Sequence, residues 1–268
     1  MKTIETSIDG GVAQIRLNRP DKANSLNAIM WQELRKAMHW LDATPQARVG
    51  VLSANGAHFC AGIDLNMLGE LKAASAQACE GRSRENLRRG ILDPQDTITA
   101  IERCRKPVIA SVHAACVGGG IDIITACDMR YCSEQAWFSV KEIDLGLVAD
   151  VGTLQRLPRL VGEGMARELA YTGRRFSGAE AEKMRLVNTC FASAEALNDA
   201  VQSLAQLIAA KSPLSIRGTK ELINYVRDHS VADGLNYVAT WNAAMLFSDD
   251  LQESLSAAKE KRVAKYRD

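Results

Sequence analysis

The sequence predicts an α/β fold in which apolar strands lead through glycine-rich loops into helices. The strand from Arg48 to Leu52 leads into the loop Gly56–Leu65, and Val108–Val112 leads into a second loop that contains Gly118-Gly119-Gly120. From Ala194 onward the periodicity of apolar residues is almost purely helical. We therefore expect a core over residues 1–193 that holds the active site, followed by a C-terminal helical region over residues 194–268.

Composition excludes several classes of function. The chain has 33 Lys and Arg against 32 Asp and Glu, a formal net charge of +1, so nothing indicates general attraction to nucleic acid or to an anionic membrane. No apolar run approaches membrane-spanning length, and the first residues lack the apolar stretch of a signal peptide. The seven cysteines are scattered without metal-ligand spacing, which favours buried thiols in a reducing compartment.

The first elements follow from local signals. Ile4–Ile8 and Val12–Leu17, with the turn Asp9-Gly10-Gly11 between them, predict a β-hairpin. Apolar residues then recur at helical spacing up to Leu41, and Asn27 is the expected N-cap of this helix.

The middle of the chain has weaker local signals. Residues 70–92 are polar with weak periodicity, and Asp93-Pro94 should break any preceding element, so we expect an irregular surface excursion. A short helical stripe over Ile98, Ile101 and Cys104 should follow it.

Further strands and helices are expected after the triple glycine. The sequence predicts strands at Met129–Cys132 and Ala136–Val140, a loop at 144–152, and helices at Thr153–Leu157 and Gly164–Tyr171, with Gly173 as C-cap. Ser177 to Glu180 has the pattern of a capping box that opens another helix. Pro213 should separate the first two C-terminal helices.

The two glycine-bearing loops could place backbone N–H groups on opposite sides of one oxygen atom. Ala61 and Gly119 are the candidates, and such a pair stabilises the oxyanion that forms when a thioester becomes an enolate. On spacing alone, two tight turns between strand and helix explain the same residues better.

Three acids lie among apolar neighbours and are candidates for proton transfer: Asp122, Glu142 and Asp150. A carboxyl group held beside an apolar pocket can have its pKa raised into the range useful for acid/base catalysis. For each acid taken singly, a helix cap, a loop cap or an ion pair is the simpler interpretation.

Several motifs resemble those of the crotonase superfamily of enoyl-CoA hydratases and isomerases, and the resemblance extends over nearly the whole chain. They are LNRPDKANSL at Leu17–Leu26, HFCAGIDL at His58–Leu65, KPVIA at Lys106–Ala110, VGGGID at Val117–Asp122 and GTLQRLP at Gly152–Pro158. The resemblance implies a crotonase-like spiral of ββα units with a C-terminal helical trimerisation region, and a homotrimer or a dimer of trimers. It also implies an acyl-CoA thioester substrate and an oxyanion hole from Ala61 and Gly119.

By the same resemblance, two loops would bind the CoA part of the substrate. The residues are Lys22, Ala23 and Asn24 in the first loop and Ala61, Gly62, Ile63 and Asp64 in the second. No separate cofactor and no metal are implied, because coenzyme A enters as part of the substrate.

Arg130–Pro158 is most similar to the Δ3,5-Δ2,4-dienoyl-CoA isomerases. Hydratases typically have Glu at the positions of Asp122 and Glu142 and glycine at that of Asp150. The resemblance implies that Glu142 takes a proton from C2 and Asp150 delivers one to C6, although the opposite assignment stays open, while Asp122 orients the site. The alternatives are an enoyl-CoA hydratase acting on a 2-enoyl-CoA and a non-catalytic acyl-CoA-binding protein.

The expected setting is oxidation of unsaturated fatty acids. The chain ends in Ala-Lys-Tyr-Arg-Asp, without a peroxisomal tripeptide, which favours the cytoplasm of a bacterium. Acyl-chain length cannot be derived from the sequence.

Overall fold

The N-terminal hairpin opens the fold as predicted. The computed structural model describes all 268 residues, and its first elements are β1 (Ile4–Asp9) and β2 (Val12–Leu17), paired antiparallel. Asp9 pairs with Val12, so Gly10 and Gly11 alone make the turn. Both have positive φ, 54° and 83°, which is the backbone that a tight two-residue hairpin turn requires.

The main sheet has six strands in the order β1-β2-β3-β4-β6-β9, and every pair after the hairpin is parallel. Its further strands are β3 (Val49–Ala54), β4 (Val108–Val112), β6 (Met129–Ser133) and β9 (Thr189–Phe191). A smaller sheet, β5-β7-β8, comprises Ala115–Val117, Trp137–Ser139 and Phe176–Ser177. Neighbouring parallel strands must be joined by crossover connections, and these place the loops of the site at the same edge of the sheet.

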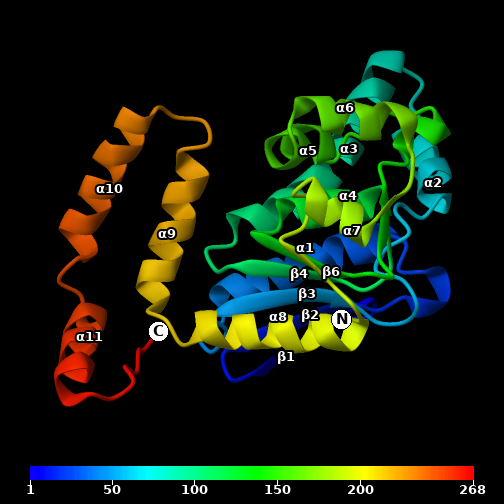
Figure 1. The fold of residues 1–268 in the computed structure, drawn as a ribbon. Coiled ribbons are helices and arrows are strands. Elements are labelled where there is room, and N and C mark those ends of the chain that lie inside the picture. The colour runs from blue at the N-terminus through cyan, green and yellow to red at the C-terminus, as the bar shows by residue number, and fades with distance from the viewer.

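Helices cover both faces of the main sheet (Figure 1). On one face, α1 (Ala28–Ala43) and α4 (Gly119–Ala126) contribute to a cluster of 39 buried apolar residues, and Asn27 caps α1 by accepting from the Met30 N–H at 2.9 Å. On the other face, α8 (Ala194–Ala209) packs Leu197, Val201, Ala205 and Ala209 onto β2, β3 and β4. α8 thus covers the sheet that carries the site.

The segment predicted to be irregular is helical, and that prediction is wrong. α2 (Asn66–Ser75) and α3 (Glu80–Arg103) occupy it, and the expected short stripe is the last part of α3. Pro94 lies inside α3, where it removes only the hydrogen bond to the Gly90 carbonyl. A Cβ at Gly90 would lie 2.3 Å from the Leu71 Cδ1, so the absence of a side chain lets α2 and α3 pack closely.

The helices α5 (Thr153–Val161), α6 (Glu163–Thr172) and α7 (Gly178–Lys183) lie where the sequence predicts helices. The short 3-10 helices η1 (Pro20–Lys22) and η2 (Glu142–Leu145) were not predicted. Gly173 ends α6 in a left-handed conformation, and the Ser177 hydroxyl accepts from the Glu180 N–H at the start of α7.

Three helices form an arm that extends away from the sheet (Figure 1). They are α9 (Pro213–Tyr225), α10 (Val231–Met245) and α11 (Asp249–Glu260). The Arg48 guanidinium donates to the carbonyls of Ala209 (3.1 Å) and Tyr266 (2.5 Å), which ties the C-terminal tail to the core. The division of the chain at residue 194 stays a prediction. None of these helices is both long and apolar enough to cross a membrane.

Candidate active site

The two glycine-bearing loops lie side by side. The Cys60 N–H donates to the Ala115 carbonyl and the Val117 N–H to the Cys60 carbonyl, both at 2.9 Å. A Cβ on Gly120 would lie 3.1 Å from the Cys116 Sγ and 3.3 Å from the Cys60 oxygen, so a side chain there would crowd both loops. Gly118, with a φ of 50°, turns the chain from β5 into α4.

In the loop at 61–64, some backbone N–H groups have a hydrogen-bond acceptor in the protein and others have none. The Ala61 N–H donates to the Ala23 carbonyl at 3.0 Å, so the predicted oxyanion donor is already occupied. The Ile63 N–H has no acceptor in the protein, although its neighbours are bonded to Leu26. Gly119 is the first residue of α4, where an N–H has no acceptor inside the helix. The free amides are therefore those of Ile63 and Gly119, and the sequence prediction is corrected at Ala61.

The loop predicted to bind CoA is held in an unusual backbone. Ala23 and Asn24 both have positive φ, 48° and 52°. The buried Asn24 amide accepts from the Arg19 N–H at 2.7 Å and donates to the carbonyls of Asn55 and His58 at 2.8 Å, which stabilises that conformation. Lys22 is exposed beside it.

Asp64 joins the two predicted CoA loops. Its carboxylate pairs with Arg19 at 3.1 Å, and hydrogen bonding to that guanidinium holds the pKa of Asp64 below its usual value. The ion pair thus joins the two loops, while the Lys22 ammonium stays exposed to solvent.

A cavity of about 570 Å³ brings the predicted site residues together. Asp122, Glu142 and Asp150 line it, as do Ala61, Gly62, Ile63 and Gly119, whereas Lys22, Ala23, Asn24 and Asp64 lie outside it. Its apolar wall comes from α1, α2, α3, η2 and the loop after η2, with Trp31, Met67, Leu68, Leu71, Leu87, Ile91, Pro94, Leu145, Leu147 and Val148. The mispredicted segment at 66–103 thus supplies much of the wall.

Glu142 lies beside the first glycine of the triple. A Cβ on Gly118 would lie 3.2 Å from the Glu142 Oε1, so the carboxyl packs against the backbone next to Gly119. Its Oε2 is buried without a hydrogen-bond partner. Burial raises the pKa of Glu142, and the negative charge of Asp150 adds to the shift. An acid with a raised pKa therefore lies close to the free amide of Gly119.

Asp122 is buried one turn into α4 and is bonded to the start of α5. Its Oδ1 accepts from the Thr153 N–H at 2.6 Å and from the Thr153 hydroxyl at 2.7 Å. Burial raises the pKa of Asp122 to about 7, the charges of Glu142 and Asp150 act in the same direction, and the bonds from Thr153 oppose them.

Asp150 precedes α5 by three residues and lines the same cavity. The Gln95 side chain donates to its main-chain carbonyl at 2.5 Å, which fixes the turn to α3. Partial burial raises the pKa of the Asp150 carboxyl. Two acids with raised pKa values, Glu142 and Asp150, therefore face one apolar cavity from opposite ends of an exposed loop.

Two buried side-chain atoms in the protein lack a hydrogen-bond partner, and both belong to cavity residues. They are the Glu142 Oε2 and the Trp31 Nε1. Buried polar groups are normally paired, so an unpaired acceptor and an unpaired donor in one cavity favour a site for a ligand. The sequence did not distinguish Trp31 from the apolar stripe of α1. Gln95 and Thr153 were missed too, because only the fold brings them to the acids.

The chain is similar to several known proteins. A family model described as enoyl-CoA hydratase/isomerase matches residues 7–268. A peroxisomal Δ3,5-Δ2,4-dienoyl-CoA isomerase of Arabidopsis thaliana is 51% identical over 99% of the chain and 96% of the relative. The mitochondrial enzyme of that name from Homo sapiens is 44% identical, over 97% of the chain and 80% of the relative. A crystal structure of an enoyl-CoA hydratase from Bacillus anthracis has a TM-score of 0.88 at 31% identity and covers 99% of both chains.

The names of these relatives also bear on location. They refer to peroxisomes and mitochondria, which disagrees with the bacterial protein expected from the sequence. The cytoplasmic location of this chain stays a prediction.

Proposed function

The chain belongs to the enoyl-CoA hydratase/isomerase family, and from that premise we propose that it is a Δ3,5-Δ2,4-dienoyl-CoA isomerase. The observation that carries the proposal is the placement of Glu142 and Asp150, both with raised pKa values, in one apolar cavity with two free backbone amides. Two relatives bearing that enzyme's name, at 51% and 44% identity, support the choice.

The proposed reaction moves two protons and no electrons between molecules. A base removes a proton from C2 of the 3,5-dienoyl thioester, and the electron pair delocalises over the chain to the thioester oxygen as a dienolate. An acid then delivers a proton to C6, which leaves double bonds at C2 and C4. One proton departs and one arrives, so neither a redox cofactor nor a metal is required, and coenzyme A enters as part of the substrate.

Glu142 is the proposed base at C2. Its carboxyl packs against Gly118, next to the free amide of Gly119. A thioester oxygen bound at that amide would put C2, two bonds away, within reach of the carboxyl. Asp150 is then the proposed acid at C6, at the other end of the loop, and Asp122 orients the turn through Thr153.

The proposed oxyanion hole is formed by the N–H groups of Ile63 and Gly119. A Cβ on Gly62 would lie 3.1 Å from the Val117 oxygen and 3.7 Å from the Gly119 nitrogen, so the two loops approach each other at backbone distance. Preorganised amides that meet a developing oxyanion lower the barrier by roughly 3 kcal/mol each. Ala61 instead braces the CoA loop through Ala23.

The CoA part of the substrate is proposed to lie along Lys22, Ala23 and Asn24 and the facing backbone from Ala61 to Asp64. Phosphates would meet the exposed Lys22 ammonium. The acyl chain would enter the cavity between α2 and α3, where the lining is apolar. The pathway we propose is the oxidation of unsaturated fatty acids.

We also propose that the arm mediates a homotrimer or a dimer of trimers. Large apolar side chains are exposed on it in the single chain, including Val231 at 79%, Leu235 at 64% and Phe247 at 85% of their surface. Large exposed apolar side chains on one segment favour an interface between proteins.

The assay for the proposed function follows the absorbance of the conjugated 2,4-dienoyl-CoA formed from a 3,5-dienoyl-CoA. Asp150→Asn should slow the reaction by roughly 1000-fold, because a positioned acid contributes on the order of 10² to 10⁴. Asp144→Asn is the matched control, since this exposed acid of the same loop pairs with Lys141 and does not line the cavity. Undiminished turnover by Asp150→Asn would remove the assigned role.

A further inference from the structure

The turn that carries Asp150 is held by side chains of two helices. Gln95 of α3 donates to the Asp150 carbonyl, and Asp122 of α4 accepts from Thr153. At the far end of the turn, Glu102 of α3 accepts from Arg156 through Oε2, at 2.7 Å from Nη2 and 3.2 Å from Nε. Asp122 lines the cavity, whereas Gln95 and Glu102 lie outside its lining.

Arg156 presses directly on the turn. A Cβ on Gly152 would lie 2.0 Å from the Arg156 Nη1, so the guanidinium lies against the α-carbon of Gly152, two residues from Asp150. Gly152 has a φ of 135°, a conformation that L side chains rarely adopt. The position of the Arg156 guanidinium therefore limits where the turn and its acid can lie.

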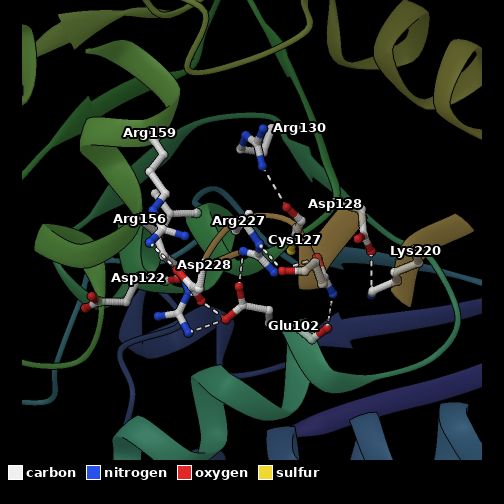
Figure 2. A network of polar contacts seen from close by, with 12 residues as sticks. Glu102, Asp122, Cys127, Asp128, Arg130, Arg156, Arg159, Lys220, Arg227 and Asp228 are labelled. Carbon is white, nitrogen blue, oxygen red and sulfur yellow. Dashed lines mark hydrogen bonds and ion pairs between the residues drawn. The ribbon is translucent and has the colours of Figure 1, made fainter. Parts of the chain in front are cut away.

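Glu102 also holds the arm. Its second carboxylate oxygen, Oε1, pairs with Arg227, just after α9, and its main-chain carbonyl accepts from the Asn224 side chain at 3.3 Å. Figure 2 shows Glu102 with dashed contacts to the arginines of α5 and of the arm. Although burial opposes the charged form, the guanidiniums of Arg156 and Arg227 lower the pKa of Glu102, so the bridge is an ionic one. One carboxylate thus connects the arm to the turn of Asp150.

We propose that Glu102 is a positioning residue that transmits the docked position of the arm, through Arg227 and Arg156, to the acid Asp150. The inference rests on the proposed function, in which Asp150 protonates C6. Loss of Arg227 leaves one oxygen of Glu102 without its partner, so the carboxylate can rotate toward solvent. Arg156 is then free to move away from Gly152. The acid would then be misplaced while Glu142 and the two free amides keep their geometry.

A second ion pair between the same regions provides the control. Arg159 of α5 pairs with Asp228, the neighbour of Arg227, at 2.9 Å. Both side chains are more than half exposed, 51% and 70%, and neither contacts Glu102. Arg159→Met therefore removes one arginine and one ion pair between α5 and the arm without affecting the bridge.

The experiment compares Arg227→Met, Arg227→Lys and Arg159→Met in two measurements. The first is the rate of 2,4-dienoyl-CoA formation, and the second is exchange of the C2 hydrogen of the 3,5-dienoyl-CoA with deuterium from solvent. Exchange reports proton removal at C2 and does not need Asp150. Light scattering checks that each variant keeps the oligomeric state of the wild type.

Arg227→Met should slow isomerisation roughly tenfold or more, since a small misplacement of a catalytic group can cost up to about 100-fold. For Arg227→Met, the rate of C2 exchange and KM should stay within about twofold of the wild type. Arg227→Lys should restore part of the isomerisation rate, and Arg159→Met should match the wild type. The proposal for Glu102 would be overturned if Arg227→Met lost exchange and isomerisation equally, if it lost the wild-type oligomeric state, or if it lost no activity. A wild type that forms no 2,4-dienoyl product would instead overturn the proposed function.

Discussion

Asp122 accepts two hydrogen bonds from Thr153, at 2.6 Å from the backbone N–H and 2.7 Å from the hydroxyl. The buried acid of α4 thereby fixes the first residue of α5 and, with it, the turn that carries Asp150. These two hydrogen bonds stabilise the buried acid, which has no cation beside it. Its partners are neutral donors, so its charge is costly.

The raised pKa of Asp122 predicts a pH dependence of stability. The folded protein retains the proton of this acid up to about pH 7, whereas an unfolded Asp releases it near 3.8. Stability from this group is therefore complete below the unfolded pKa and is lost as pH rises through the folded pKa. Asn at this position keeps an oxygen for Thr153 but carries no charge.

Between about pH 5 and about pH 8, the unfolding free energy of Asp122→Asn should consequently fall less than that of the wild type. Urea denaturation at each pH measures this. Asp144→Asn, an exposed acid outside the cavity, should retain the slope of the wild type. Equal slopes for Asp122→Asn and the wild type would contradict burial of this charge.

Glu142→Gln tests the base at C2. The amide has nearly the same shape but cannot accept a proton, so both isomerisation and solvent exchange at C2 should fall by roughly 100-fold or more. Asp150→Asn should lose isomerisation and keep exchange. The opposite pattern, with exchange lost in Asp150→Asn alone, would reverse the assignment of the two acids.

The exposed apolar residues of the arm predict its role in assembly. Phe247→Glu places a charge where a partner would bury an aromatic ring and should shift the protein from trimer toward monomer in light scattering. Leu207→Glu is the matched control, because this α8 residue is 57% exposed and lies outside the arm. Dissociation by Leu207→Glu alone would place the interface elsewhere.

Much of the fold could be predicted because local signals determine it. The Gly10-Gly11 turn, the Asn27 cap and the Gly173 C-cap each work through neighbouring residues. The sequence failed at α3, whose buried residues are confined to its C-terminal part, at Thr97, Ile98 and Ile101. The first turns of α3 show no apolar face, and packing with α2 overrides the effect of Pro94.

The candidate site divides in the same way. The acids and the glycine loops could be predicted from residue type and family resemblance, and the cavity does bring them together. The free amide could not, because only the bond from Ala61 to Ala23 shows that Ile63 is the unoccupied donor. Gln95 and Glu102 depend on partners distant in the sequence, and Trp31 is distinguished only by the cavity it lines, which no local pattern specifies.

The most direct measurement offers the wild-type protein a 3,5-dienoyl-CoA and, separately, a 2-enoyl-CoA of the same chain length. The account predicts rapid growth of conjugated-dienoyl absorbance from the first and a rate of water addition to the second at least roughly 100-fold lower. In the proposed mechanism only the dienoyl substrate requires both Glu142 and Asp150, the two acids that line the cavity. Water addition at a comparable or higher rate would contradict the account and identify a hydratase. Binding of both thioesters without turnover of either would contradict it as well and leave an acyl-CoA-binding protein.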